Sequence, residues 1–134
     1  MAALTCILVT PEATALEAKA DFVALPLEDG EIGIAPARSP LIGRVGFGEL
    51  RIRSGPTLAR WYVDGGFVQV AYNVVSVLAD IAIPGPQIDA AVVEEQLRAA
   101  LKRPARTRES IEARQREAAR ARAQLRVARR AQTP

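Results

Sequence analysis

The sequence has no histidine and a single cysteine among its 134 residues. Without histidine, the chain lacks the side chain that most often serves as a general acid or base near neutral pH, so we do not expect an enzyme. One cysteine excludes an internal disulfide and a cysteine-based metal cluster, and we expect no metal site. Cys6 lies in the apolar run LTCILVT, which favours a buried core thiol over a reactive one.

Long apolar runs and aromatic residues are also scarce. No stretch approaches the roughly 18 apolar residues that span a bilayer, and the N-terminus has no basic segment followed by an apolar one, so we expect no signal peptide. Aromatic residues make up 4% of the chain, but apolar residues make up 49%, which is enough for the core of one main domain. We therefore expect a cytosolic protein, or one docked on a larger body from the cytosolic side.

Charge is segregated along the chain. Residues 1–87 hold 6 basic and 9 acidic residues, a net charge of −3, whereas residues 88–134 hold 12 basic and 6 acidic residues, a net charge of +6. Such an asymmetry says more about binding partners than about the fold.

The periodicity of the sequence changes near Pro84-Gly85-Pro86. Before this point, short segments such as ELRIRS alternate apolar and polar residues, and turn signals stand at Asp64-Gly65-Gly66 and at Tyr72-Asn73. Short strands at close spacing predict an antiparallel β-sandwich rather than βαβ units. We assign the sandwich to residues 1–86.

Residues 87–134 have a helical period and predict a hairpin of two helices. Asp89 is expected to cap the first helix, and Pro104 is expected in the turn before a second helix that begins at Arg106 or Thr107. The expected apolar faces are Val93, Leu97, Ala100 and Leu101 on the first helix, and Ile111, Ala118, Ala121, Leu125 and Ala128 on the second. The predicted fold class is therefore α+β, an N-terminal antiparallel β-sandwich followed by a C-terminal α-helical hairpin.

An acidic turn in the stretch LPLEDGEIGIAPARSPL is the first candidate site. It carries Glu28, Asp29 and Glu31, and we treat it as one loop stiffened by Pro36 and Pro40. Asp29 and Glu31 could in principle bind a cation, although a solvated hairpin turn is the simpler interpretation.

The second candidate is the basic end of the chain, where seven arginines from Arg114 onward face one acid, Glu117. On a helix, Arg122, Arg126, Arg129 and Arg130 share one face. We expect no acid of this chain to pair with that face. It is either solvated or meets carboxylates or phosphates of another molecule.

Several segments carry a resemblance to a known family: residues 9–41, GFGELRIR, YVDGGFVQVAYNVVSVLAD, IDAAVVEEQLRAAL and ARAQLRVA. In this order they resemble the epsilon subunit of the bacterial-type rotary ATP synthase. The resemblance implies a β-sandwich with a helical hairpin in a non-catalytic central-stalk subunit. Such a subunit couples the catalytic sector of a proton-translocating ATP synthase to the membrane ring and can inhibit it through the hairpin. It also implies a peripheral place at the cytoplasmic face of the inner (plasma) membrane.

The resemblance further implies partners for the candidate residues. Glu28, Asp29 and Glu31 would meet the ring of c subunits, and Arg38 and Arg44 would lie toward the gamma subunit or the ring, with gamma as the expected contact. The basic face of Arg122, Arg126, Arg129 and Arg130 would reach the catalytic beta subunits. The chain departs from the family where Arg38 stands in place of a histidine.

Some family members bind ATP on the folded hairpin, through a pattern that Ile88 and Asp89 match, together with second-helix arginines that correspond to Arg122 and Arg126. Val92 occupies the place of an arginine in that pattern, and we expect its side chain on the buried side, where it cannot contact phosphate. We therefore expect no cofactor, and ATP is not expected as a regulatory ligand.

The alternative is a β-sandwich that binds RNA or DNA through its basic helical tail. The tail suits this function, but the net acidic sandwich with few aromatic residues does not. Copurification separates the two hypotheses, because the first predicts ATP synthase subunits and the second predicts nucleic acid that salt releases.

Overall fold

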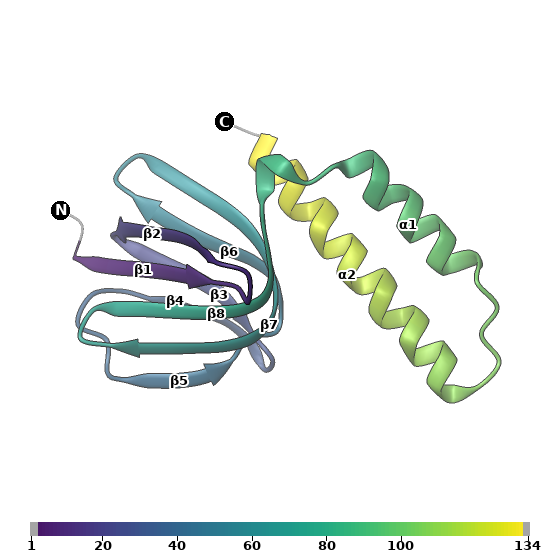
Figure 1. Ribbon diagram of the computed structural model, residues 1–134, viewed down its shortest axis with the longest axis horizontal. Coiled ribbons are helices and arrows are strands. Elements are labelled where there is room, and N and C mark those ends of the chain that lie inside the picture. The colour runs from purple at the N-terminus through teal and green to yellow at the C-terminus, as the bar shows by residue number, and fades with distance from the viewer. Residues whose placement is uncertain (1–2, 133–134) are drawn as a thin grey trace.

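The computed structural model describes residues 3–132 and has the predicted α+β fold, a β-sandwich followed by a helical hairpin (Figure 1). The strands are β1 (Leu4–Val9), β2 (Thr14–Ala20), β3 (Phe22–Leu27), β4 (Gly30–Ile34), β5 (Leu41–Arg44), β6 (Phe47–Ser54), β7 (Thr57–Ala71) and β8 (Val74–Pro84). A 3₁₀ turn, η1 (Gly85–Gln87), leads to helices α1 (Ala90–Lys102) and α2 (Arg108–Gln132). None of the helices in residues 3–132 is long and apolar enough to cross a membrane.

The strands follow the order β2-β1-β8-β7-β6-β3-β4, with β5 also paired to β7. Every pairing is antiparallel except that of β1 with β8, which is parallel. The first half of β7 pairs with β6 and its second half pairs with β5. The long strand β7 therefore takes part in both layers of the sandwich.

The turn expected at Asp64-Gly65-Gly66 is wrong, because β7 runs through these residues without a break. Gly65 and Gly66 have φ values of 74° and 103°, and a Cβ on Gly66 would lie 1.8 Å from the carbonyl oxygen of Leu78. The glycines thus let β7 bend and approach β8 closely. The turn expected at Tyr72-Asn73 is confirmed, and both residues have positive φ, as in a type I′ hairpin turn.

The sandwich encloses a continuous apolar core in which the side chains of Leu4, Leu8, Leu25, Ile34 and Leu50 are almost wholly buried. Cys6 belongs to this core, as expected, and burial raises the pKa of its thiol to about 12. A second, smaller buried cluster lies where the helices cover one outer surface of the sandwich, and it includes Tyr62 of β7 and Leu125 and Val127 of α2.

The acidic turn and the prolines do not form one loop, contrary to the prediction. Glu28 and Asp29 form the turn between β3 and β4, whereas Pro36 and Pro40 lie in the connection from β4 to β5. Between them, β4 pairs along its whole length with β3. The stiff connection contacts the β7–β8 turn instead, because the Ala37 N–H donates to Asn73 Oδ1 at 2.8 Å.

The helical hairpin has the expected ends. The Asp89 carboxylate accepts hydrogen bonds from the backbone N–H groups of Ala91 and Val92 and so caps α1. Thr107 caps α2, since its hydroxyl oxygen accepts from the Ser110 N–H at 3.0 Å. Leu101 does not belong to the buried face of α1 as expected, because it is 47% exposed at the last turn of the helix.

Candidate functional site at the interface between sandwich and hairpin

Helix α2 has two packing faces. On the first face, Ala123, Val127 and Arg130 border a hollow together with residues of β6. Arg120 lies on the same face, one turn before Ala123, and its side chain contacts Asp64 of the sandwich. The other face follows Ala118, Ala121, Leu125 and Ala128, as the sequence predicted, and its first two members border residues of α1. Helix α2 lies against β6 and β7, and α1 packs on the side of α2 that faces away from the sandwich (Figure 1).

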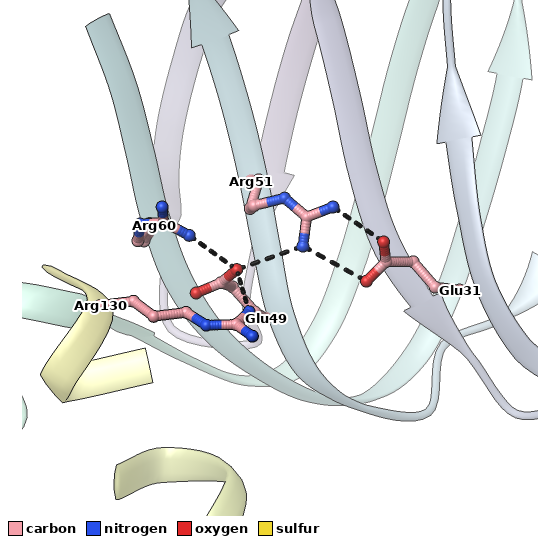
Figure 2. Close-up of polar contacts among 5 residues, drawn as sticks. All are labelled: Glu31, Glu49, Arg51, Arg60 and Arg130. Carbon is pink, nitrogen blue, oxygen red and sulfur yellow. Dashed lines mark hydrogen bonds and ion pairs between the residues drawn. The ribbon is translucent and has the colours of Figure 1, made fainter. Parts of the chain in front are cut away.

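The first polar contact across this interface is centred on Glu49 of β6, whose side chain is 7% exposed. Its Oε1 atom accepts from Arg60 at 2.9 Å, from Arg51 at 3.2 Å and from Arg130 of α2 at 3.2 Å (Figure 2). Among residues 3–132, the buried Oε2 atom has no hydrogen-bond partner. One carboxylate thus joins two strands of the sandwich to the end of α2.

The second polar contact is centred on Asp64 of β7. Its Oδ2 atom accepts from the Tyr62 hydroxyl at 2.9 Å and from Arg120 Nε of α2 at 2.8 Å. The Arg120 guanidinium also lies 5.1 Å from the centre of the Phe47 ring. Burial, and then the charge of Asp64, raise the pKa of Tyr62 above its ordinary value, so the hydroxyl remains a donor at neutral pH.

The expectation that the basic face has no acid of this chain to pair with is wrong for Arg130, which binds Glu49. Arg122, Arg126 and Arg129 are exposed, and no ion pair of Arg122 or Arg126 occurs in residues 3–132. The sequence analysis did not identify the acceptors, Glu49 and Asp64. No feature of the neighbouring sequence indicates which acidic residues of the sandwich a helix will cover. Arg120 was also missed as a contact of the sandwich.

The acidic residues divide into two groups. Glu28 and Asp29 are exposed at the turn, whereas Glu31 on β4 forms an ion pair with Arg51 at 2.8 Å (Figure 2). Arg51 in turn contacts Glu49, so Glu31 belongs to the edge of the Glu49 network. No group of three possible metal-ligating side chains occurs in the described part of the chain.

The two arginines expected at the gamma subunit lie near opposite ends of β5. Arg38 is exposed in the connection before the strand, and Arg44 ends the strand. The carbonyl oxygen of Arg44 accepts from the Glu28 N–H at 3.0 Å, and its guanidinium lies 5.8 Å from the centre of the Phe67 ring. Arg44 is therefore a neighbour of the acidic turn.

The residues of the possible nucleotide site are not brought together. Ile88 is buried beneath the helices, and Asp89 uses its carboxylate to cap α1. The expected burial of Val92 is wrong, because its side chain is 50% exposed. Arg122 borders a hollow at the far end of α1, whereas Arg126 borders the hollow beside Glu49.

The outer surface of β5, β7 and β8 carries an exposed apolar patch that sequence reasoning did not single out. Its members are Ile42, Phe67, Leu78 and Ile81, which are 77%, 54%, 51% and 48% exposed. Phe67 pairs across the strands with Arg44 on one side and Leu78 on the other. We call these four residues the apolar patch. The sequence predicted a strand here, but not that its outer side would carry apolar residues on three adjacent strands.

These features define a class of protein, a small β-sandwich with a helical hairpin whose distinctive surfaces suit protein contacts. Residues 3–85 match the family model of the ATP synthase delta/epsilon chain β-sandwich domain. An ATP synthase epsilon chain of Rhodopirellula baltica is 44% identical over 126 residues, which cover 94% of this chain and 98% of the relative. One from Desulfitobacterium hafniense is 42% identical over 81 residues, covering 60% of this chain and 61% of the relative.

Two solved structures share the fold. A chain of the Euglena gracilis mitochondrial ATP synthase, in a structure of OSCP, F1 and the c-ring, has a TM-score of 0.77 at 18% identity and covers 99% of this chain and 83% of its own. A chain of the Tetrahymena thermophila mitochondrial ATP synthase, in a structure of the central stalk and c-ring, has a TM-score of 0.62 at 17% identity, with coverages of 98% and 97%.

This chain belongs to the ATP synthase delta/epsilon family, as the match of its sandwich domain and the 44% identity over most of its length show. Its relatives are named as the epsilon chain, a non-catalytic subunit of the ATP synthase complex, and this chain is likewise a non-catalytic subunit. The nucleic-acid alternative loses part of its basis, because Arg120 and Arg130 of the basic helix pair with acids of the sandwich.

Proposed function

We propose that this chain is a rotor subunit in the central stalk of a proton-translocating ATP synthase, where it couples the catalytic sector to the c ring. The exposed apolar patch is the structural observation that carries this proposal. Contiguous apolar residues on the surface of a small protein mark a site for another protein. A non-catalytic subunit needs such a site, because its effect on the complex depends on firm attachment.

We assign the gamma subunit to the apolar patch. Arg44 borders the patch through Phe67, in agreement with the gamma contact proposed for Arg44 from the sequence. Arg38 lies in the connection before β5, so in this proposal the contact with gamma continues beyond the first residue of the strand. Burying large apolar side chains such as Ile42 and Phe67 supplies the main favourable free energy of such an interface.

We assign the c ring to the acidic turn. Glu28 and Asp29 are exposed and have room to meet polar loops of another protein. Glu31 contributes less in this proposal, since it already shares Arg51 with Glu49. Attachment through gamma and the ring would hold the chain at the cytoplasmic face of the inner (plasma) membrane as a peripheral subunit.

We further propose that the basic helix restrains ATP hydrolysis by reaching carboxylates of the catalytic beta subunits. Arg122 and Arg126 are exposed on α2 and available to such a contact, and Arg129 is exposed beside them, whereas Arg130 must first leave Glu49. An arginine that meets a carboxylate across a partly desolvated interface contributes about 1.5–3 kcal/mol. The proposal requires neither a metal nor a bound nucleotide.

The attachment site is tested by the double substitution Phe67→Ser and Leu78→Ser, with the affinity for purified gamma measured by titration calorimetry. We expect a loss of affinity of at least about thirtyfold, because one hot-spot residue alone contributes roughly 2 kcal/mol or more. The matched control is Leu58→Ser, which removes an apolar side chain that is 40% exposed outside the patch. Equal affinities of the double variant and the parent would contradict the assignment.

A further inference from the structure

The connection between α1 and α2, together with the residues that flank it, is strongly basic. Residues 102–108 hold four basic residues and no acidic one. We call this segment the basic tip, and its four exposed cations are Lys102, Arg103, Arg106 and Arg108. In the described part of the chain, Arg103 alone among them forms an ion pair, with Glu117 of α2. The basic tip therefore carries charge that the hairpin itself does not neutralise.

The fold of the basic tip does not depend on these charges. The backbone N–H groups of Arg106 and Thr107 donate to the Ser110 hydroxyl oxygen at 3.1 Å and 3.0 Å, so backbone and hydroxyl groups shape the start of α2. Cations beside the N-terminus of a helix oppose its dipole. Arg106 and Arg108 stand at such an N-terminus, so their charges do not stabilise the helix and are available to a partner.

An apolar side chain lies beside these cations. Leu101, the residue before the basic tip, is 47% exposed. It borders a hollow together with Arg114 and Arg122 of α2. An exposed apolar residue among arginines matches a partner that is both anionic and apolar. A lipid with an anionic headgroup combines these two properties, because the start of its acyl chains lies directly beneath the charge.

Helix α2 runs along the sandwich toward the acidic turn and continues past it. Near its C-terminal end Arg130 binds Glu49, and ten residues earlier Arg120 borders a hollow together with Glu28 of the acidic turn. The helix begins twelve residues before Arg120, at Arg108, and this segment is about 18 Å long. The loop at its start stands clear of the strands (Figure 1). The basic tip therefore projects beyond the end of the sandwich that carries the acidic turn.

We propose that the basic tip, with Leu101, binds the anionic lipid surface of a membrane. The direction of the tip in the complex rests on the proposed function, which assigns the acidic turn to the c ring. A ring within a membrane is surrounded by lipid, so a tip that projects past the turn is directed toward that lipid. The affinity for anionic lipid itself is a property of the isolated chain.

The charge of the basic tip suffices for reversible binding. Each basic residue close to an anionic surface raises the partition coefficient about fivefold. Two acids, Glu109 and Glu112, follow on α2 and offset part of this attraction. The attraction falls off within a Debye length, about 8 Å at physiological salt. Binding is therefore weak, sensitive to salt and dependent on the charge of the lipid.

Cosedimentation of the isolated full chain with lipid vesicles at low salt tests the proposal. The parent should bind vesicles that contain phosphatidylglycerol and should be released by high salt, and it should not bind vesicles of phosphatidylcholine alone. Arg106→Gln with Arg108→Gln should lower the partition coefficient about 25-fold, since each basic residue contributes about fivefold. The matched control is Lys19→Gln with Arg53→Gln, which removes the same charge from exposed sites on β2 and β6 and should bind as the parent does.

Three results would overturn the proposal. The first is binding by the parent that is no stronger with phosphatidylglycerol than with phosphatidylcholine. The second is an equal loss for the two pairs of substitutions, because net charge rather than the basic tip would then govern binding. The third is retention on immobilised polyglutamate without binding to the anionic vesicles, which would assign the tip to an acidic protein. None of these measurements uses gamma or the c ring, so they separate failure of the lipid contact from failure of the proposed function.

Discussion

The sandwich core and the interface with the hairpin are built in opposite ways. The core packs large side chains such as Leu8, Leu25 and Leu50, none of which is exposed. The interface has a smaller apolar cluster, with Tyr62, Leu125 and Val127, and two ion pairs, Arg120–Asp64 and Arg130–Glu49, beside it. Deep apolar packing makes a unit that unfolds all at once, whereas a smaller apolar contact flanked by ion pairs depends in part on the salt concentration. The difference teaches that one short chain can combine a deeply packed body with a helical hairpin held partly by ion pairs.

The largest expected effect separates the two regions directly. Leu25→Ala should lower the free energy of unfolding of the sandwich by about 2–5 kcal/mol, because it leaves a cavity in the core. Val127→Ala should have a smaller effect, about 1–2 kcal/mol, because it removes two buried methyl groups at the interface. Urea denaturation of the full chain, followed through Trp61 fluorescence, gives both values. Similar losses for the two variants would mean that core and interface form one cooperative unit.

The next effect concerns the division of the chain near Pro84-Gly85-Pro86, which remains a prediction. A fragment of residues 1–86 should keep a cooperative thermal transition and bind gamma. Its stability should fall by roughly 2–3 kcal/mol, the transfer free energy of about one large apolar side chain, because Tyr62 loses its cover. Calorimetry of the fragment checks this. A fragment without a transition, or a folded one that does not bind gamma, would contradict the two-part division.

A third prediction uses the charges of α2. Changing Arg122, Arg126, Arg129 and Arg130 to glutamate should raise the steady-state ATPase rate of the assembled catalytic sector several-fold, since each proposed contact with a carboxylate across a partly desolvated interface contributes about 1.5–3 kcal/mol. Deleting residues after Lys102 should raise the rate at least as much. Glu49→Gln with Asp64→Asn should lower it, because the hairpin is freed with its arginines intact. Equal rates for all variants would leave α2 as a solvated helix without an inhibitory role.

The smallest effect on folding is expected at the acidic turn. Glu28→Lys with Asp29→Lys should change stability by under about 0.5 kcal/mol, because both residues are exposed. Glu31→Lys should cost up to about 1 kcal/mol, since it breaks the ion pair with Arg51. The triple variant should nevertheless weaken ATP-driven proton pumping in membrane vesicles. Pumping at the parental level would count against a contact with the ring.

The overall architecture could be predicted because its signals are local. Alternation in ELRIRS, the Pro84-Gly85-Pro86 break and the helix cap at Asp89 each act within a few residues. The sequence could not distinguish a bend within β7 from a turn between two strands, because a Gly65-Gly66 pair is compatible with either structure. Only the pairing of β7 with β5 and β6 on its two halves distinguishes them.

The candidate site was less predictable because its contacts join distant parts of the chain. Glu49 and Arg130 are 81 positions apart, and Asp64 and Arg120 are 56 apart. Periodicity grouped Arg130 with Arg122 and Arg126 on one helix face, but it could not say that the sandwich covers part of this face. It likewise could not reveal that Phe67 is exposed beside Leu78 of the neighbouring strand.

Copurification tests the central claim, that this chain is a subunit of an ATP synthase held through the apolar patch, most directly. The full chain carrying an affinity tag is isolated from its own cells at low and high salt, beside the Phe67→Ser, Leu78→Ser variant. The account predicts that gamma and the other catalytic-sector subunits accompany the parent at both salt concentrations and are lost from the variant. Recovery of nucleic acid that salt releases, without these subunits, would contradict it.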